Sequence, residues 1–409
     1  MARVSTSYRR GGTGYRLPGI VYRRTYDEVF SGAAALVQPR RRAVTVRIYD
    51  RQDLLVAILS TNAQRPTILA LDWELLDTGC GAFTMELAAD PGIQHDFRLD
   101  IHLWNDPDPI YSGLVQRLPE PGSTNRTFTF GGYGFLDMLN RMLVTETYGP
   151  QNVRAIVNDL SAKLGARQPR LVPDQTQVDY VPYSTAGSLA FLRTLAKDAL
   201  KQLAELAGGY TWGVDADRKL FFKAPNQAVD MHSWVGKHLE TFTPQSESDA
   251  IVTVVYVKAG KVRNDLPSDN PFYKTNWLEE PIKDDAAIAL WEWREGVYSA
   301  PSVLNLVDAA VAATVWLSQN SKPRQYASVK GLVYDGERLS CVGQARIVGK
   351  GGAQFILPKK SLKFKLGPTS VDVSLELGDL DYTAAVVVSR LAAATGAENL
   401  ARQNSQKQL

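Results

Sequence analysis

The chain is 409 residues long, too long for one ordinary hydrophobic core, so we expect several domains. Its apolar fraction of 44% and charged fraction of 22% are those of ordinary folded proteins and exclude a collagen-like or broadly disordered chain. The net charge of +3 is small for this length. The two cysteines, Cys80 and Cys341, cannot form a disulfide framework or a zinc site without convergent histidines, and we expect both to be buried.

The sequence contains no targeting or membrane signal. No run approaches the roughly 18 apolar residues of a membrane span. The N-terminus is basic but lacks the apolar stretch of a secretory signal. We therefore expect no membrane segment and a chain that folds in the cytoplasm.

Residues 1–42 carry the excess positive charge. They hold nine arginines against Asp27 and Glu28, a net charge of +7, which leaves −4 for the rest of the chain. Tyrosines and glycines are scattered among the arginines without the period of a strand or helix, so we predict an extended arm that orders against a partner. An acidic protein surface is the favoured partner, ahead of a solvated tail and of nucleic acid. The arginines expected to dock are Arg9, Arg10, Arg16, Arg23, Arg24, Arg40, Arg41 and Arg42.

A first β-rich domain is predicted at 43–131. Val44, Val46 and Ile48 alternate with polar residues, which is typical of a strand with one buried face. Further short apolar runs follow, separated by turn residues, and this spacing favours a β-barrel or sandwich.

A helical α/β domain is predicted at 132–237. Helical periodicity appears at 135–143, at 153–164 and most strongly at 189–206, where leucines fall on one stripe. Two aromatic strands at 210–214 and 219–222 frame an Asp-containing turn and predict a hairpin. Asp215 and Asp217 lack the further oxygen ligands of a calcium loop, so we interpret them as turn residues.

The last third of the chain predicts a second β-barrel-like domain, formed by residues 238–259 and 325–380. Within it, residues 250–258 are expected to form an early strand, and residues 353–357 and 362–366 two separate later strands. The insertion 260–324 contains a polar excursion and a helix that Ser302 can cap. Residues 381–409 predict a C-terminal helix and tail. The insertion also carries three tryptophans expected to be exposed contacts: Trp277, Trp291 and Trp293.

No catalytic, metal or cofactor site is predicted. None of the four histidines has the spacing of a helical zinc motif. Ala186-Gly187-Ser188 lacks the second glycine of a nucleophile elbow, and Gly131–Gly134 is better explained as a turn between a strand and a helix. Carboxylates such as Asp72 and Glu74 have the pattern of charges on a strand face. The fold class expected is a β-rich α+β, multidomain protein with two β-barrel-like domains flanking a helical α/β domain and an extended N-terminal arm.

Five motifs follow one another in an order that is typical of one protein family. They are a Tyr-Ser-Gly strand turn, a glycine pair before a helix, a Leu-rich helix leading to a Trp-containing strand, a Leu-x-Phe strand and a strand ending in Leu-Glu-Leu-Gly. The motifs lie at Ile110–Val115, Gly132–Arg141, Leu192–Ala196 with Gly209–Asp215, Leu220–Phe222, and Leu375–Gly378. This order resembles the baseplate-hub family of tailed-phage tails, which is shared with contractile-tail hubs and secretion-system spike hubs. The Arg-rich arm and the Trp-rich excursion at 260–296 depart from that pattern.

The resemblance implies a structural hub rather than an enzyme. Two similar barrels per subunit, repeated in a homotrimer, would form a ring at the tail tip of a siphophage-like virion. The implied partners are further copies of the chain, a distal tail or tail-tube protein, the tape-measure protein and a central fibre or spike, with transient passage of genomic DNA. A body of mildly negative charge after residue 42 suits DNA exit, since phosphate contacts would retain the genome. The alternative hypotheses are a tail-associated cell-wall hydrolase and a host-receptor protein that binds carbohydrate through its tryptophans.

Overall fold

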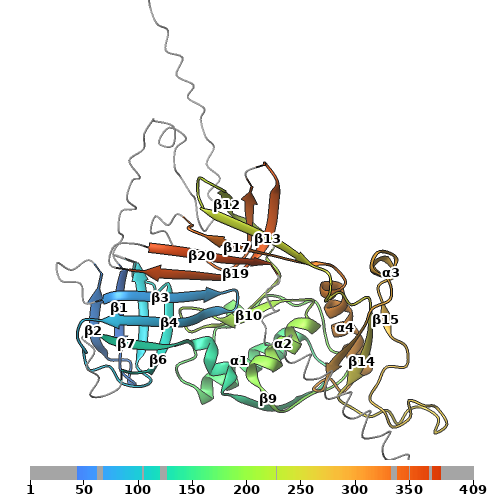
Figure 1. The fold of residues 1–409 in the computed structure, drawn as a ribbon. Coiled ribbons are helices and arrows are strands. Elements are labelled where there is room, and N and C mark those ends of the chain that lie inside the picture. Colours follow the sequence, from blue (N-terminus) through green and yellow to red (C-terminus); the bar gives the residue numbers. More distant parts are fainter. Residues whose placement is uncertain are drawn as a thin grey trace, which may run out of the picture.

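Strands dominate both ends of the part of the chain that the structure describes (Figure 1). The structure, a computed structural model, describes residues 44–61, 68–103, 106–119, 127–226, 228–332, 339–349, 351–367 and 371–378. The N-terminal β part consists of β1 (Val44–Tyr49), β2 (Leu55–Ser60), β3 (Ile68–Leu76), β4 (Gly79–Leu87), β5 (Arg98–Leu103), β6 (Tyr111–Arg117) and β7 (Phe128–Gly134). The C-terminal β part consists of β12 (Val229–Trp234), β13 (Thr241–Glu247), β17 (Arg324–Lys330), β18 (Gln344–Val348), β19 (Gln354–Leu366) and β20 (Val371–Gly378).

The middle of the chain contains most of the helices. Its first half comprises η1 (Phe135–Asn140), β8 (Leu143–Tyr148), α1 (Val153–Arg167), η2 (Gln175–Gln177), β9 (Leu189–Leu195), α2 (Ala196–Leu206), β10 (Thr211–Val214) and β11 (Leu220–Lys223). Its second half comprises β14 (Val254–Ala259), β15 (Ile282–Lys283), α3 (Asp285–Trp291), β16 (Glu295–Ala300) and α4 (Leu306–Asn320). None of the described helices has the length and apolar character needed to cross a membrane.

The two β parts share one sheet. Its described strands number 15, and the main path runs β13-β17-β20-β19-β3-β4-β7-β6-β5-β1-β2, with β10, β11, β12 and β18 attached beside it. Most neighbours on this path are antiparallel, and the protein is β-rich and multidomain, as predicted. The described strands form an open path, so the two closed barrels expected from the strand spacing are not seen among them.

Buried apolar side chains form two cores. The β core joins side chains of β1 to β7 with side chains of β12 and β17 to β20. The helical core joins η1, α1, α2 and α4 with the strands β8, β9, β14 and β16. Both halves of the middle segment therefore bury their apolar residues in the same core. They do so although β12 and β13, which belong to the C-terminal β part, lie between the two halves in the sequence.

The placement of residues 250–258 in the second β-rich domain was wrong. β14 pairs in parallel with β16 and antiparallel with β15, in a three-stranded sheet separate from the large one. Val255 and Val257 of β14 are buried in the helical core. A run of valines predicts a buried strand but does not specify its neighbours, because strand pairing depends on residues far away in sequence. The other domain boundaries stay a prediction.

Two predicted helices begin differently in the structure. The stripe at 189–206 is a strand, β9, followed by the helix α2, because β9 pairs along its length with β8. Leu192, which the stripe predicted to be buried, is 75% exposed. The helix expected at 135–143 is the short 3₁₀ helix η1, and its last predicted residue already belongs to β8.

Two smaller corrections concern local signals. Asn305, not Ser302, caps α4, and its side chain accepts a hydrogen bond from the Val307 amide at 2.8 Å. The strands expected at 353–357 and 362–366 are one long strand, β19, which continues through Pro358. The arm 1–42 and the expected C-terminal helix and tail at 381–409 lie outside the described residues.

Candidate functional site at the junction of the two β parts

The N-terminal and C-terminal β parts meet at a continuous antiparallel pair of strands. Residues 71–76 of β3 face residues 366–361 of β19 in an unbroken register of six pairs. β3 also pairs with β4, and β19 also pairs with β20, so the junction lies inside the sheet rather than at an edge. Because backbone hydrogen bonds cross it without interruption, the two parts are coupled as neighbours within one sheet.

An aromatic pair lies on the inner face of this junction. Trp73 of β3 and Phe364 of β19 are directly opposite in the register, and their rings stack with centroids 4.6 Å apart. Each side chain is only 2% exposed. Strand pairing places the two rings side by side, and such a pair contributes about 1 kcal/mol beyond the burial of its apolar area.

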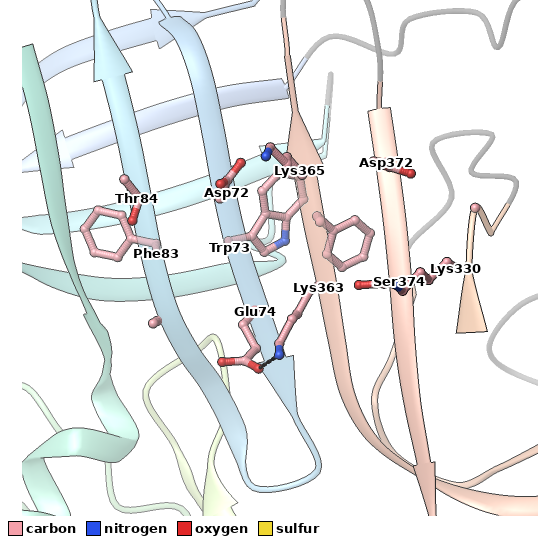
Figure 2. A pocket seen from close by; sticks show the side chains of 13 residues that line it. Asp72, Trp73, Glu74, Phe83, Thr84, Lys330, Lys363, Lys365, Asp372 and Ser374 are labelled. Carbon is pink, nitrogen blue, oxygen red and sulfur yellow. Dashed lines mark ion pairs between the residues drawn. The ribbon is translucent and has the colours of Figure 1, made fainter. Parts of the chain in front are cut away.

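Charged side chains occupy the outer face, where they line a hollow of about 440 Å³ (Figure 2). The strand registers place them in rows that cross four strands. One row is Thr84, Asp72, Lys365 and Asp372, and the next contains Glu74, Lys363 and Ser374. Opposite charges therefore face each other across the β3–β19 boundary.

Side-chain contacts at the hollow also connect β3 to β19. Glu74 accepts a hydrogen bond from the Ser361 hydroxyl at 2.7 Å and lies 3.6 Å from the Lys363 ammonium. Burial raises the pKa of the Asp72 carboxyl, while the Lys365 charge acts in the opposite direction. The carboxylate oxygen Oδ1 of Asp72 and the indole nitrogen of Trp73 are buried without a hydrogen-bond partner among the described residues.

The lining of this hollow provides attraction between opposite charges. Its lining contains no histidine and no cysteine. Across the described residues, no group of three or more His, Cys, Asp and Glu side chains is arranged to hold a metal ion. Opposite charges directly across a strand pair stabilise it by roughly 0.2–1 kcal/mol, and they disfavour a register shift that would bring like charges together. Asp72 and Glu74 thus lie on a strand face, as their spacing predicted.

A second contact connects the N-terminal β part to the helical core. The hairpin of β10 and β11 reaches β4, where Val214 pairs with Gly79. In its turn, Asp215 accepts a hydrogen bond from the Lys219 amide at 2.8 Å, which agrees with the interpretation of this aspartate as a turn residue. Arg218 then lies 3.2 Å from the carboxylate of Asp53, which follows β1.

Sequence analysis missed a buried carboxylate in the helical core. Asp308, in the first turn of α4, is fully buried and accepts hydrogen bonds from the Tyr183 hydroxyl at 2.6 Å and from the amides of Ala186 and Gly187 at 2.8 Å. A side chain at Gly187 would collide with Asn305. The Ala-Gly-Ser motif is therefore a structural cradle for Asp308, and the only sequence signal for it was an acidic residue in a first helical turn.

The other singled-out residues do not line the junction hollow. Trp277 and Trp291 are half-buried, whereas Trp293 is 50% exposed and donates its indole hydrogen to Glu295 at 2.8 Å. Lys258 lies over the Trp277 ring and Lys283 over the Trp293 ring. Cys80 and Cys341 are free and buried, and burial raises the pKa of the Cys80 thiol to about 12. The docking arginines of the arm lie outside the described residues.

Comparison with known proteins decides which fold this is. No protein-family model matches the sequence, and no curated protein matches it. A solved structure of the 43 kDa tail protein of prophage MuSo2 from Shewanella oneidensis matches with a TM-score of 0.58 and 11% identity, over 82% of this chain and 98% of that one. The chain has the fold of a phage tail protein. A tail protein from Neisseria meningitidis MC58 matches this tail-protein fold with a TM-score of 0.57, 12% identity and coverage of 82% and 96%. Prophage tail protein gp18 from Listeria monocytogenes EGD-e matches with a TM-score of 0.51, 10% identity and coverage of 85% and 98%.

Proposed function

We propose that the chain is a structural hub subunit of a phage tail tip or baseplate, where copies of it form a ring that joins the tail tube or distal tail protein to a central fibre or spike. The observation that carries this proposal is the β3–β19 junction within a tail-protein fold. A ring subunit transmits load between the proteins above and below it, and an unbroken sheet resists the relative motion of its two β parts.

The proposed role requires no catalysis. The junction hollow is lined by charged side chains, and its carboxylates lie beside lysines of the opposite strand. The tape-measure protein and the exiting genomic DNA are further proposed contacts of the ring, within the tail tip of the virion. A trimer is the proposed assembly, and barrel-like closure of the two β parts is proposed to occur in it.

Averaged electron micrographs of assembled particles test the proposal. We expect copies of this chain around the tail axis at the tip, between the tube and the fibre or spike. A tip that lacks the chain, or holds it as a single copy, would contradict the hub. Purified protein should also fail to clear host cell walls, and robust clearing would support the hydrolase instead.

A further inference from the structure

The two edges of the large sheet differ in their protection against further strand pairing. β13 forms one edge and β2 the other, and among the described strands each has one partner, β17 and β1 respectively. β13 contains Pro244, which removes a backbone N–H, and its exposed side chains are polar. Proline and polar residues are common devices that protect an edge from association.

β2 has no such protection. The sequence from Leu54 to Ser60 contains no charge, no proline and no glycine. Leu54, directly before β2, and Val56 and Ile58 within it are between 43% and 66% exposed. We call these three side chains the β2 strip. An exposed apolar row on an open edge strand marks an interaction surface.

A second apolar surface lies at the opposite end of the molecule, beside α3 (Figure 1). Leu290, Trp293 and Val297 are between 50% and 75% exposed there, and Glu295, between the last two in the sequence, accepts a hydrogen bond from the Trp293 indole. We call these three side chains the α3 face. The segment 279–295 around this face contains six acidic residues against Lys283 and Arg294, a net charge of −4. The α3 face therefore combines exposed apolar side chains with a surrounding segment of net negative charge.

The β2 end has the complementary charge. Arg47 pairs with Ile58 across β1 and β2, so it lies next to the strip. Arg40, Arg41 and Arg42 are separated in the sequence from Val44, the first residue of β1, by Ala43 alone, and they belong to a segment with a net charge of +7. Asp53, the residue before the strip, is already engaged, since it forms ion pairs with Arg98 and Arg218.

We infer that the β2 strip of one copy docks on the α3 face of a second copy, so that the positive charge next to the strip meets the acidic residues around that face. The contact joins unlike surfaces at opposite ends of the molecule, so repetition of it produces a ring when the rotation closes. Apolar contact would provide the association, and the opposite charges would select the partner end. This inference rests on the proposed self-assembly and specifies which surfaces carry it.

Complementation between two variants tests this contact in the full-length chain. Ile58→Glu damages the strip, and Trp293→Ala with Val297→Glu damages the α3 face. Each variant alone should associate about a hundredfold more weakly than the unchanged chain in sedimentation velocity, because a buried charge lies at the centre of the contact. Mixed at equal amounts, the two variants should form a one-to-one dimer, because each retains one intact surface.

A matched control separates this effect from damage to the fold. Ile356 on β19 is another exposed isoleucine, at 45%, and Ile356→Glu should associate like the unchanged chain. Circular dichroism and the urea midpoint should be the same for all variants, since the changed side chains are exposed in the monomer.

Three outcomes would overturn the inference. In the first, the Ile58→Glu variant associates as tightly as the unchanged chain, which leaves the ring in place but moves its contact elsewhere. In the second, the α3-face variant alone still forms dimers, which indicates that two β2 strips pair with each other. In the third, the unchanged chain is monomeric at all concentrations while its Trp293 side chain binds host polysaccharide. Failure of the hub itself would appear separately, as absence of the chain from the tail tip.

Discussion

The β core and the helical core hold distant segments together by different means. In the β core, strand pairing places Trp73 against Phe364. The fully buried side chain of Lys359 on β19 forms an ion pair there with Asp230 at 2.7 Å. In the helical core, one buried and one partly buried carboxylate are held by neutral donors. Asp308 accepts hydrogen bonds from Tyr183 and two amides, and Glu205 of α2 accepts one from the Tyr298 hydroxyl of β16.

This difference separates two kinds of rigidity. A backbone ladder with stacked rings depends on shape, so its stability should change most when volume is lost. A carboxylate held by hydroxyl and amide donors depends on protonation and on complete hydrogen bonding, so small chemical changes without loss of volume should matter there. Substitutions that change only one of these properties can therefore distinguish the two cores.

The largest expected effect is at the aromatic pair of the β core. Trp73→Ala should lower the free energy of unfolding by about 4 kcal/mol, because it removes a fully buried ring and leaves a cavity beside Phe364. Urea unfolding followed by circular dichroism measures this loss. Trp73→Phe keeps a ring in the stack, so its loss of unfolding free energy should be less than half of the loss caused by Trp73→Ala.

Trp277→Ala is the matched control for Trp73→Ala. Trp277 is half-buried in the insertion, with Lys258 over its ring, and its removal should cost less than about 1 kcal/mol. Equal losses at the two tryptophans would contradict the conclusion that the junction is the stronger aromatic contact.

A smaller effect is expected at the buried carboxylate of the helical core. Asp308→Asn keeps the shape of the side chain but replaces one accepting oxygen with a donating group, which then faces a donor among Tyr183, Ala186 and Gly187. The free energy of unfolding should fall by about 2 kcal/mol. Asp285→Asn, at an exposed aspartate in the first turn of α3, should change it by less than about 0.5 kcal/mol. A neutral result at Asp308 would show that its hydrogen bonds do not secure the loop before β9.

Local features of this fold could be predicted from the sequence, and the pairing of distant segments could not. The hairpin of β10 and β11 was predicted correctly because its signal, two aromatic runs around an Asp-containing turn, lies within a dozen residues. The helix α1 was predicted for the same reason, since its apolar residues recur at helical spacing. The tail-protein fold was predicted from the order of several such local motifs.

The junction site itself was beyond sequence analysis. Glu74 and Ser361 are 287 residues apart in the sequence, and nothing in either strand indicates the other as its partner. Alternation indicated that Asp72 and Glu74 lie on a strand face, but the lysines opposite them depend on the β3–β19 register. β9 was mistaken for helix because its leucines also fit a helical period, and pairing with β8 decides between the two.

The smallest expected effect is a pH dependence at Glu205. Burial raises the pKa of this carboxyl, against the weaker lowering effect of its hydrogen bond from Tyr298. A raised pKa means that the folded state favours the protonated form, so this group's contribution is complete below the ordinary glutamate pKa of about 4.3 and is lost as the pH rises through the raised value. Asp72, Asp100 and Asp215 have pKa values raised by burial as well and act with the same sign. Glu205→Gln should therefore reduce the loss of stability between pH 4 and pH 8 by about 1 kcal/mol without removing it.

Glu295→Gln provides the control of opposite sign. Glu295 also accepts a hydrogen bond from a tyrosine, Tyr256, but it is exposed, and its hydrogen bonds from Trp293 and Tyr256 lower its pKa. A lowered pKa means that the contribution of this group is present above the ordinary glutamate pKa and is lost as the pH falls through the lowered value. In unfolding free energies measured from pH 8 down to about pH 2, Glu205→Gln should therefore reduce the loss of stability above the ordinary glutamate pKa. Glu295→Gln should instead reduce the loss of stability below that pKa. The same direction for both would indicate that hydrogen bonding to tyrosine, rather than burial in the helical core, sets the response of Glu205.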